Sequence, residues 1–215
     1  MPSILAHIIY AMKNDIRLWG PELYLGSQGP DVFFYVNDKK HREIGNKLHE
    51  LKISDYYELM KNFPETFFKG FISHLELDEK LHPIINSFYA ESKTHTKFEY
   101  NFDELLSLRF IGNHFIENKW WKILKVDNIK KISKEFDRIL MKEFNIEINF
   151  EFVYNKMLKN LKLLFQYPYL KKNIIAKKLK LIGIDYTYLY PKIIEKDINK
   201  LKHLENEFNK ILEGD

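Results

Sequence analysis

Residues able to bind a metal ion recur at every fourth position in the segment GFISHLELDEKLHP, which contains His74, Asp78 and His82. Four residues of an α-helix turn through about 400°, so residues at this spacing drift by only about 40° per step and share one face. His95 and Glu99 repeat the same spacing in the segment HTKFE. The chain must therefore place three imidazoles and two carboxylates on two helical faces. Imidazole and carboxylate are ligands that suit zinc and similar divalent ions.

Helical periodicity extends over almost the whole chain and predicts an all-α fold. The predicted helices cover residues 4–18, 39–62, 64 to the His74 motif, 87–118, 127–144, 149–166, 168–181 and 191–212. Pro83 is expected to end the third helix or to tilt its successor. Residues 20–31 hold three glycines and two prolines and are predicted to form a loop. Residues 182–191 are the least helical segment.

The chain of 215 residues is long enough to bury a core, and its composition is typical of a folded globular protein. It is 45% hydrophobic, 15% aromatic and 30% charged. Composition shifts after Trp121, because only one of the eight histidines, His203, lies beyond it. We predict a metal-binding helical core in residues 1–121. Residues 122–215 are expected to form C-terminal helices packed on that core within a single domain.

Composition also limits the classes of partner and compartment. The chain has no cysteine, so it has no disulfide and any metal must be bound by His, Asp or Glu. A net charge of +4 does not favour nucleic acid as a partner. The first residues lack the features of a signal peptide and no stretch is apolar enough to span a membrane, so we expect a cytoplasmic protein. The lysine-rich residues 155–181 are interpreted as a packed helix with a basic outer face, with weak contact to an anionic membrane surface as the alternative.

Three further candidate ligands lie upstream of the central motif. His7 belongs to the first predicted helix, Asp31 follows a Gly-Pro turn, and His49 lies in the segment GNKLH. Gly45, four residues before His49, would allow another backbone or a metal to approach closely. A lone histidine is more often an ordinary surface or core residue, so the prediction of a metal site depends on the motifs taken together.

In this order, the segments MPSILAH, LGSQGPD, GNKLH, GFISHLELDEKLHP and HTKFE resemble the zinc-dependent phospholipase C family, which includes the catalytic domain of clostridial alpha-toxin. The resemblance covers about residues 1–105. It implies a helical fold of the phospholipase C and single-strand nuclease type, with three metal ions in a cleft that hydrolyse a phosphodiester of phospholipid. The implied ligands are Asp31, His49, His74 and Asp78 for one zinc, His82, His95 and Glu99 for a second, and His7 and Asp78 with the N-terminal amine and carbonyl for a third.

The chain departs from the secreted members of that family in three ways. It begins Met-Pro-Ser, whereas the secreted mature chains begin with a tryptophan that binds the third metal. Only three residues separate Asp78 from His82, fewer than in the secreted toxins. No membrane-binding β-sandwich domain is expected after the helical region. The remaining histidines match no position of the family motifs and are predicted to be structural or exposed: His41, His114 and His203.

The predicted activity is hydrolysis of a phosphodiester by water at a site with two or three zinc ions. Asp31 is the best candidate to orient the attacking water as well as to bind metal. Glu50, Glu76 and Glu79 are candidates to orient the imidazoles. Two alternatives stay open: a single-strand nuclease on the same helical scaffold, and a non-catalytic binding module stabilised by metal. The substrate is a phosphodiester, with phospholipid as one candidate, and the sequence specifies neither its head group nor the oligomeric state.

Overall fold

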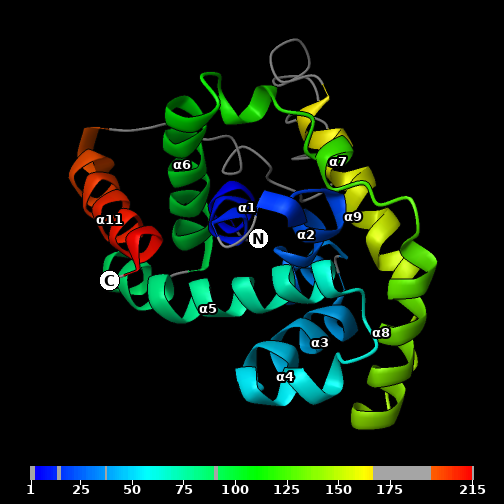
Figure 1. Ribbon diagram of the computed structural model, residues 1–215. Helices are drawn as coiled ribbons and strands as arrows, with labels where there is room; N and C mark the ends of the chain where they lie inside the picture. Colours follow the sequence, from blue (N-terminus) through cyan, green and yellow to red (C-terminus); the bar gives the residue numbers. More distant parts are fainter. Residues whose placement is uncertain (1–2, 14–15, 37, 90–91, 167–194, 215) are drawn as a thin grey trace. The chain divides into compact units, whose positions relative to one another are not determined.

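The computed structural model describes residues 3–13, 16–36, 38–89, 92–166 and 195–214, and within them the chain forms helices and connections but no strand (Figure 1). The predicted all-α fold is thereby confirmed for this part of the chain. The elements are α1 (Leu5–Met12), η1 (Ile16–Leu18), α2 (Pro21–Gly26), η2 (Gly29–Tyr35), α3 (Lys39–Glu50), α4 (Ile53–Leu59), α5 (Glu65–Phe88), α6 (Ser92–Phe110), η3 (Phe115–Glu117), α7 (Trp120–Ile123), α8 (Ile129–Phe144), α9 (Phe150–Phe165) and α11 (Glu195–Glu213), where η denotes a 3₁₀-helix.

Several predicted helix boundaries are wrong. The helix predicted over residues 4–18 ends at Met12, and the one predicted over residues 87–118 is α6, which ends at Phe110. Two further differences have a clear physical reason. The helix predicted over residues 39–62 is two helices, α3 and α4, because Leu51 and Lys52 adopt extended backbone angles with ψ of 146° and 145°. Pro83 does not end α5, which continues to Phe88. A proline within a helix removes one hydrogen bond to the carbonyl four residues earlier. Here both Pro83 and Glu79, the residue that carries this carbonyl, are exposed, so water can reach the carbonyl.

The loop predicted over residues 20–31 is also wrong, because this segment contains α2 and the start of η2. Each of the two helices has a proline, Pro21 or Pro30, at one of its first two positions. A proline is favoured there, since the first N–H groups of a helix have no partner within the helix and the fixed φ suits it. The prolines in this segment start helices, whereas prolines among glycines are more typical of loops.

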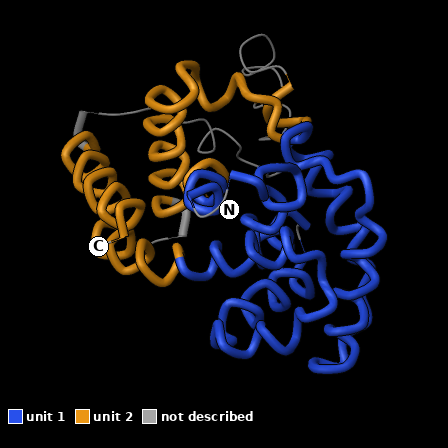
Figure 2. The backbone as a smooth tube through the Cα atoms, in the orientation of Figure 1, with its two compact units in different colours: residues 1, 7–76, 121–161 blue, residues 2–6, 77–120, 162–215 orange. Residues whose placement is uncertain are grey.

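The chain divides into two compact units (Figure 2). Unit 1 contains residues 7–76 and 121–161, and unit 2 contains residues 2–6, 77–120 and 162–215. Helices α1 and α5 each begin in one unit and continue into the other. The prediction of a single domain with a core in residues 1–121 stays a prediction.

The core of unit 1 is a cluster of phenylalanine rings around Phe136 of α8. Five rings lie with centroids 4.2–6.1 Å from that of Phe136: Phe33, Phe63, Phe67, Phe71 and Phe150. Aromatic pairs at such separations add to the free energy gained by burying each ring, about 0.5–1.5 kcal/mol per pair. Because Phe33 belongs to η2 and Phe71 to α5, this core fixes the two elements that carry Asp31 and His74.

Helices α2 and α5 approach each other closely through Gly26 and Gly70 in unit 1. A Cβ atom added at Gly26 would lie 2.2 Å from the carbonyl oxygen of Phe67, and one at Gly70 would lie 2.3 Å from that of Leu23. Only glycine therefore fits at either position. The close approach brings the end of α2 and the following Ser27 against α5, one turn before His74.

Helix α6 in unit 2 is buried on several sides and carries six buried polar residues: Thr96, Glu99, Asn101, Asp103, Glu104 and Ser107. Its apolar side packs on α11, where the rings of Phe102 and Phe208 meet edge to face with centroids 5.6 Å apart. Two of the polar residues accept hydrogen bonds from the starts of other helices. Glu104 accepts from the N–H of Phe115, and Asp103 accepts from the first residues of α1. Burial raises the pKa of Asp103 to about 7, although these donors act to lower it.

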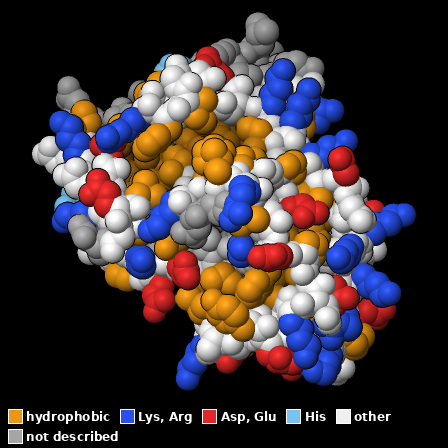
Figure 3. Space-filling model, in the orientation of Figure 1, with side chains coloured by type: hydrophobic (Ala, Val, Ile, Leu, Met, Phe, Trp, Pro, Cys, Tyr) orange, Lys and Arg blue, Asp and Glu red, His pale blue; other side chains and the backbone are white. Residues whose placement is uncertain are grey.

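No helix among the described residues has the length and apolarity needed to cross a membrane. On the face shown in Figure 3, Lys and Arg side chains are intermixed with Asp and Glu side chains, so that face has no extended patch of one charge. The predictions for residues 168–181 and 182–191, and for most of the lysine-rich segment 155–181, fall outside the described residues.

Candidate metal centre

Asp31, His49 and His74 meet in unit 1, where they come from η2, α3 and α5. The Nε2 atoms of the two histidines are 3.4 Å apart. His49 Nε2 lies 3.4 Å from Asp31 Oδ1, and His74 Nε2 lies 3.6 Å from Asp31 Oδ2. Zinc bonds of about 2.0–2.1 Å in tetrahedral geometry separate the ligand atoms by about 3.3–3.4 Å. The side chains therefore approach one another at distances close to these edge lengths, with Asp31 meeting the two imidazoles through different carboxylate oxygens.

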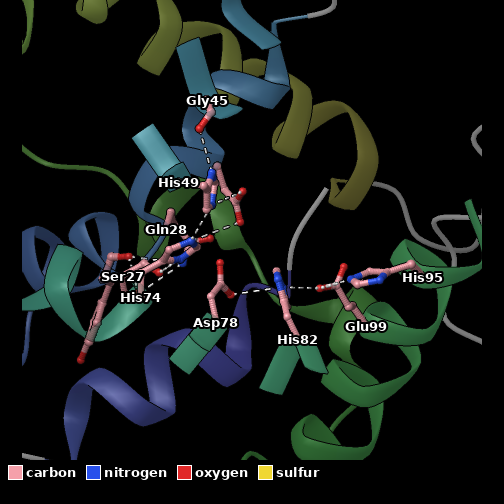
Figure 4. A network of polar contacts seen from close by, with 11 residues as sticks. Ser27, Gln28, Gly45, His49, His74, Asp78, His82, His95 and Glu99 are labelled. Atoms are coloured by element: carbon pink, nitrogen blue, oxygen red, sulfur yellow. Dashed lines mark hydrogen bonds and ion pairs between the residues drawn. The ribbon is translucent and has the colours of Figure 1, made fainter. Parts of the chain in front are cut away.

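The hydrogen bonds of the two rings fix which nitrogen faces the centre of this cluster (Figure 4). His49 Nδ1 lies 2.8 Å from the carbonyl oxygen of Gly45, and His74 Nδ1 lies 3.0 Å from that of Ser27. A carbonyl oxygen can only accept, so Nδ1 is the donor in each ring. In the neutral form, with its single N–H on Nδ1, each imidazole presents a lone pair at Nε2. Two lone pairs and a carboxylate converge, which is the arrangement that a bound cation stabilises.

Two of the three side chains in this cluster are buried. The side chains of His74 and Asp31 are only 0% and 7% exposed, whereas that of His49 is 25% exposed. Electrostatic interactions are stronger in a buried site than in water, so a divalent ion between these groups would be held more firmly there. The partial exposure of His49 leaves a side of the cluster accessible from solvent.

Aromatic rings hold both histidines in place. The ring of Phe34 stacks on His49 with centroids 5.8 Å apart and an interplanar angle of 8°. A Cβ atom at Gly45 would lie 2.7 Å from the Phe34 ring, so an aromatic ring approaches this glycine closely, where another backbone or a metal was predicted. His7 of α1 stacks on His74 with centroids 4.2 Å apart and is itself 4% exposed.

Gly29 closes the cluster from the side of η2. Its φ of +50° is in the left-handed region, which favours glycine. A Cβ atom at this position would lie 2.4 Å from His74 Cδ2 and 2.5 Å from Cγ. The Gly-Pro-Asp segment therefore supplies Asp31 and at the same time leaves room for the imidazole of His74.

Gly29→Ala is expected to displace the ring of His74 and to weaken zinc binding by about 10- to 100-fold, the usual cost of disturbing groups that orient a ligand. The left-handed φ adds a cost of about 1–2 kcal/mol in folding free energy. Gly112→Ala is the matched control, because Gly112 has a φ of +82° and a Cβ atom there would meet nothing within 4 Å. Zinc titration of both variants checks this, and equal affinities would contradict the contact with His74.

A second cluster lies in unit 2 and joins α5 to α6. His82 Nε2 lies 3.2 Å from Asp78 Oδ1 and 3.5 Å from Glu99 Oε1, and His95 Nε2 lies 3.1 Å from the same oxygen of Glu99. Figure 4 shows the carboxylate of Glu99 between the two imidazoles. One ligand atom from each of His82, His95 and Glu99 lies within 4.8 Å of the others. Three ligands at these separations would leave the fourth position of a zinc ion open.

Glu99 is ionised at neutral pH. Burial acts to raise its pKa, but hydrogen bonds with His82 and His95 outweigh burial and lower the pKa to about 2. The side chain of His82 is 38% exposed and that of His95 is 17% exposed, whereas that of Glu99 is 5% exposed. The second cluster is therefore a buried carboxylate with two partly accessible imidazoles.

The predicted site residues thus fall into two sets. Unit 1 brings together Asp31, His49 and His74, with His7 stacked on His74, and unit 2 brings together Asp78, His82, His95 and Glu99. Asp78 follows His74 by one turn of α5, and its predicted sharing of the first and third ions stays a prediction. The N-terminal amine and carbonyl predicted for the third ion lie outside the described residues.

Sequence reasoning missed the groups that orient the imidazoles. Main-chain carbonyls of Gly45 and Ser27 hold His49 and His74, whereas Glu76, one of the predicted partners, accepts from the Tyr10 hydroxyl at 3.3 Å. The Gly45 carbonyl could have been found, since it lies four residues before His49 on the same helix. No local signal marks Ser27, which is 47 residues away from His74.

The remaining histidines have contacts outside the two clusters. His41 pairs with Asp38 at the start of α3, His114 pairs with Glu104, and the ring of His203 packs against Phe88.

Comparison of the chain with protein-family models, with curated proteins and with solved structures gave no match. What the site can do must therefore be inferred from its own geometry and chemistry.

Proposed function

We propose that this protein is a zinc-dependent phosphodiesterase of the phospholipase C type. The observation that carries the proposal is the first cluster, in which two Nε2 lone pairs and a carboxylate converge at 3.4–3.6 Å while both Nδ1 atoms donate to carbonyls. Structural histidines have no need for converging lone pairs, whereas a zinc site requires them. The order of the motifs along the chain, which resembles the phospholipase C family, supports the same conclusion.

Each cluster would hold one ion. Asp31, His49 and His74 would bind the first, with Asp78, one turn further along α5, as the predicted fourth ligand. His82, His95 and Glu99 would bind the second. Zinc fits better than magnesium or calcium, because those ions prefer all-oxygen ligands and each cluster has two imidazole nitrogens. A third ion with His7 remains part of the proposal.

The chemistry follows from the anionic character of a phosphodiester, which resists attack by neutral water. Bound divalent cations neutralise charge on the phosphoryl oxygens and make water more acidic. Among the protein groups, Asp31 is the carboxylate proposed to orient the attacking water and to accept its proton. His49, His82 and His95 are partly exposed, so ions held by these residues would be accessible to a substrate oxygen from solvent.

The experiment that tests this proposal is an activity panel on zinc-loaded and chelator-treated protein. The substrates are phosphocholine esters, a generic aryl phosphodiester and single-stranded DNA. Zinc-dependent cleavage of the first two supports the phospholipase C type, and preferential cleavage of the DNA favours the single-strand nuclease. Protein that binds zinc and cleaves none of the three would overturn the enzyme proposal in favour of the metal-stabilised binding module.

A further inference from the structure

The start of α1 is held by a side chain that lies almost a hundred residues further along the chain. In unit 2, Asp103 of α6 accepts hydrogen bonds from the N–H groups of Ile4, Leu5 and Ala6 at 2.6, 3.1 and 3.0 Å. The hydroxyl of Ser3 donates to the same carboxylate at 2.5 Å. Asp103 is 0% exposed. It therefore satisfies three of the N–H groups that the start of a helix leaves without an intrahelical partner.

This capping differs from the usual kind. In a usual N-cap, the side chain of the residue just before the helix accepts a hydrogen bond from the backbone N–H of the second or third residue that follows. Here Ser3 is a donor, and the acceptor comes from another helix. Three successive N–H groups bound to one carboxylate fix both the position and the rotation of the first turn of α1. Each residue of a helix turns the side-chain direction by about 100°, so the rotation at Ala6 determines where the next side chain points.

The next residue is His7, whose ring stacks on His74 within unit 1 with centroids 4.2 Å apart and an interplanar angle of 23°. His74 is fully buried and is one of the three residues of the first cluster. The hydrogen bonds of Asp103 lie in unit 2 and the ring contact lies in unit 1, and the continuous helix α1 connects them.

We propose that Asp103 is a positioning residue, which sets the direction of His7 and thereby the stacking of His7 on His74. The inference rests on the proposed function only in taking His74 as a zinc ligand and His7 as a further one. Loss of the carboxylate should release the first turn of α1 while the remainder of the fold, held by the aromatic core of unit 1, persists.

The experiment compares Asp103→Asn with Glu104→Gln, a change at the adjacent residue of α6. Glu104 is also a buried carboxylate that accepts from a backbone N–H, that of Phe115 at 2.8 Å, but it caps η3. Histidine-labelled, zinc-free protein is measured by NMR at pH 8, where Asp103 is mostly ionised, and His7→Ala identifies the His7 signals. The readout is the nuclear Overhauser contact between the rings of His7 and His74, which a purely stabilising cap would not change.

Loss of the ring contact in folded Asp103→Asn, with the contact intact in Glu104→Gln, is the expected result. Retention of the contact in Asp103→Asn would overturn the inference. If Asp103→Asn does not fold, Asp103→Ser, which also removes the carboxylate, takes its place, and the same ring contact should be lost. An unchanged contact in folded Asp103→Ser would then overturn the proposal.

Zinc titration of the same proteins separates this inference from the proposed function. We expect zinc affinity to fall about tenfold or more in Asp103→Asn and to stay unchanged in Glu104→Gln. Loss of the ring contact with unchanged zinc affinity would overturn the role of His7 at the metal and leave the positioning by Asp103 standing. A wild-type protein that binds no zinc would overturn the proposed function, while the ring contact is measured without metal.

Discussion

His74→Ala should abolish the stabilisation that zinc bound at the first cluster gives to the protein. A ligand that binds only the folded state stabilises it by about 4 kcal/mol at a free concentration about 1,000 times its Kd. For a chain of this size, each kcal/mol shifts the midpoint of thermal unfolding by about 2–4 °C, so the first cluster should contribute about 8–16 °C. The measurement is the difference in midpoint between zinc-loaded and chelator-treated protein, for the wild type and the variant.

His41→Ala is the matched control for this experiment. His41 lies on α3 as His49 does, but its ring pairs with Asp38, and the backbone N–H that Asp38 caps is kept in the variant. The control should keep the full zinc-dependent shift. If His74→Ala also kept it, zinc would not be held by the first cluster. A wild type with the same midpoint in zinc and in chelator would exclude a structural role for the metal.

Asp31→Asn should lower the turnover of any phosphodiester that the wild type cleaves by about 10²- to 10⁴-fold, the range of a lost general base. Zinc content should fall much less, because the asparagine side chain keeps one oxygen at the same place and His49 and His74 keep their carbonyl partners. An effect on turnover at constant zinc content is the signature of a group used mainly in the transition state.

Asp38→Asn provides the control for Asp31→Asn. Asp38 is a carboxylate just before α3, where it caps the N–H of His41, and asparagine caps a helix about as well as aspartate. Its turnover and zinc content should match those of the wild type. Full activity of a zinc-replete Asp31→Asn protein would refute the role assigned to Asp31 in orienting water.

Much of the site could be predicted from sequence because its ligands obey helical spacing. His74, Asp78 and His82 lie on one helix at intervals of four, and His95 and Glu99 repeat this on the next helix. Such positions share a face whatever the rest of the chain does. The contact between His82 and Glu99 then needs only that α5 and α6 pack together.

The features that sequence reasoning missed depend on contacts between distant parts of the chain. The polar residues of α6 are the clearest case, since nothing near Asp103 or Glu104 indicates that each is buried as the cap of another helix. In the sequence, a buried carboxylate looks the same as a surface one. The two can be distinguished only once the fold shows which helix N-terminus the carboxylate caps. The carbonyl of Ser27, which orients His74, could not be predicted from the sequence for the same reason.

The helix boundaries predicted at prolines are wrong because the effect of a proline depends on its position within the helix. Pro21 and Pro30 lie at the beginnings of helices, where they are favoured, and Pro83 lies on an exposed side of α5, where the helix tolerates it. The sequence shows that a proline is present, but the side of the helix that faces water is decided by packing. In α5, the buried residues Leu81 and Ile85 on either side of Pro83 keep the helix in place.

The most direct test of the central claim is the zinc content of the protein after zinc loading and removal of free metal. We predict two or more equivalents per chain in the wild type, one equivalent fewer in His74→Ala, likewise one fewer in Glu99→Gln, and no change in His41→Ala. One equivalent or none in the wild type would contradict the proposal that each of the two clusters holds an ion.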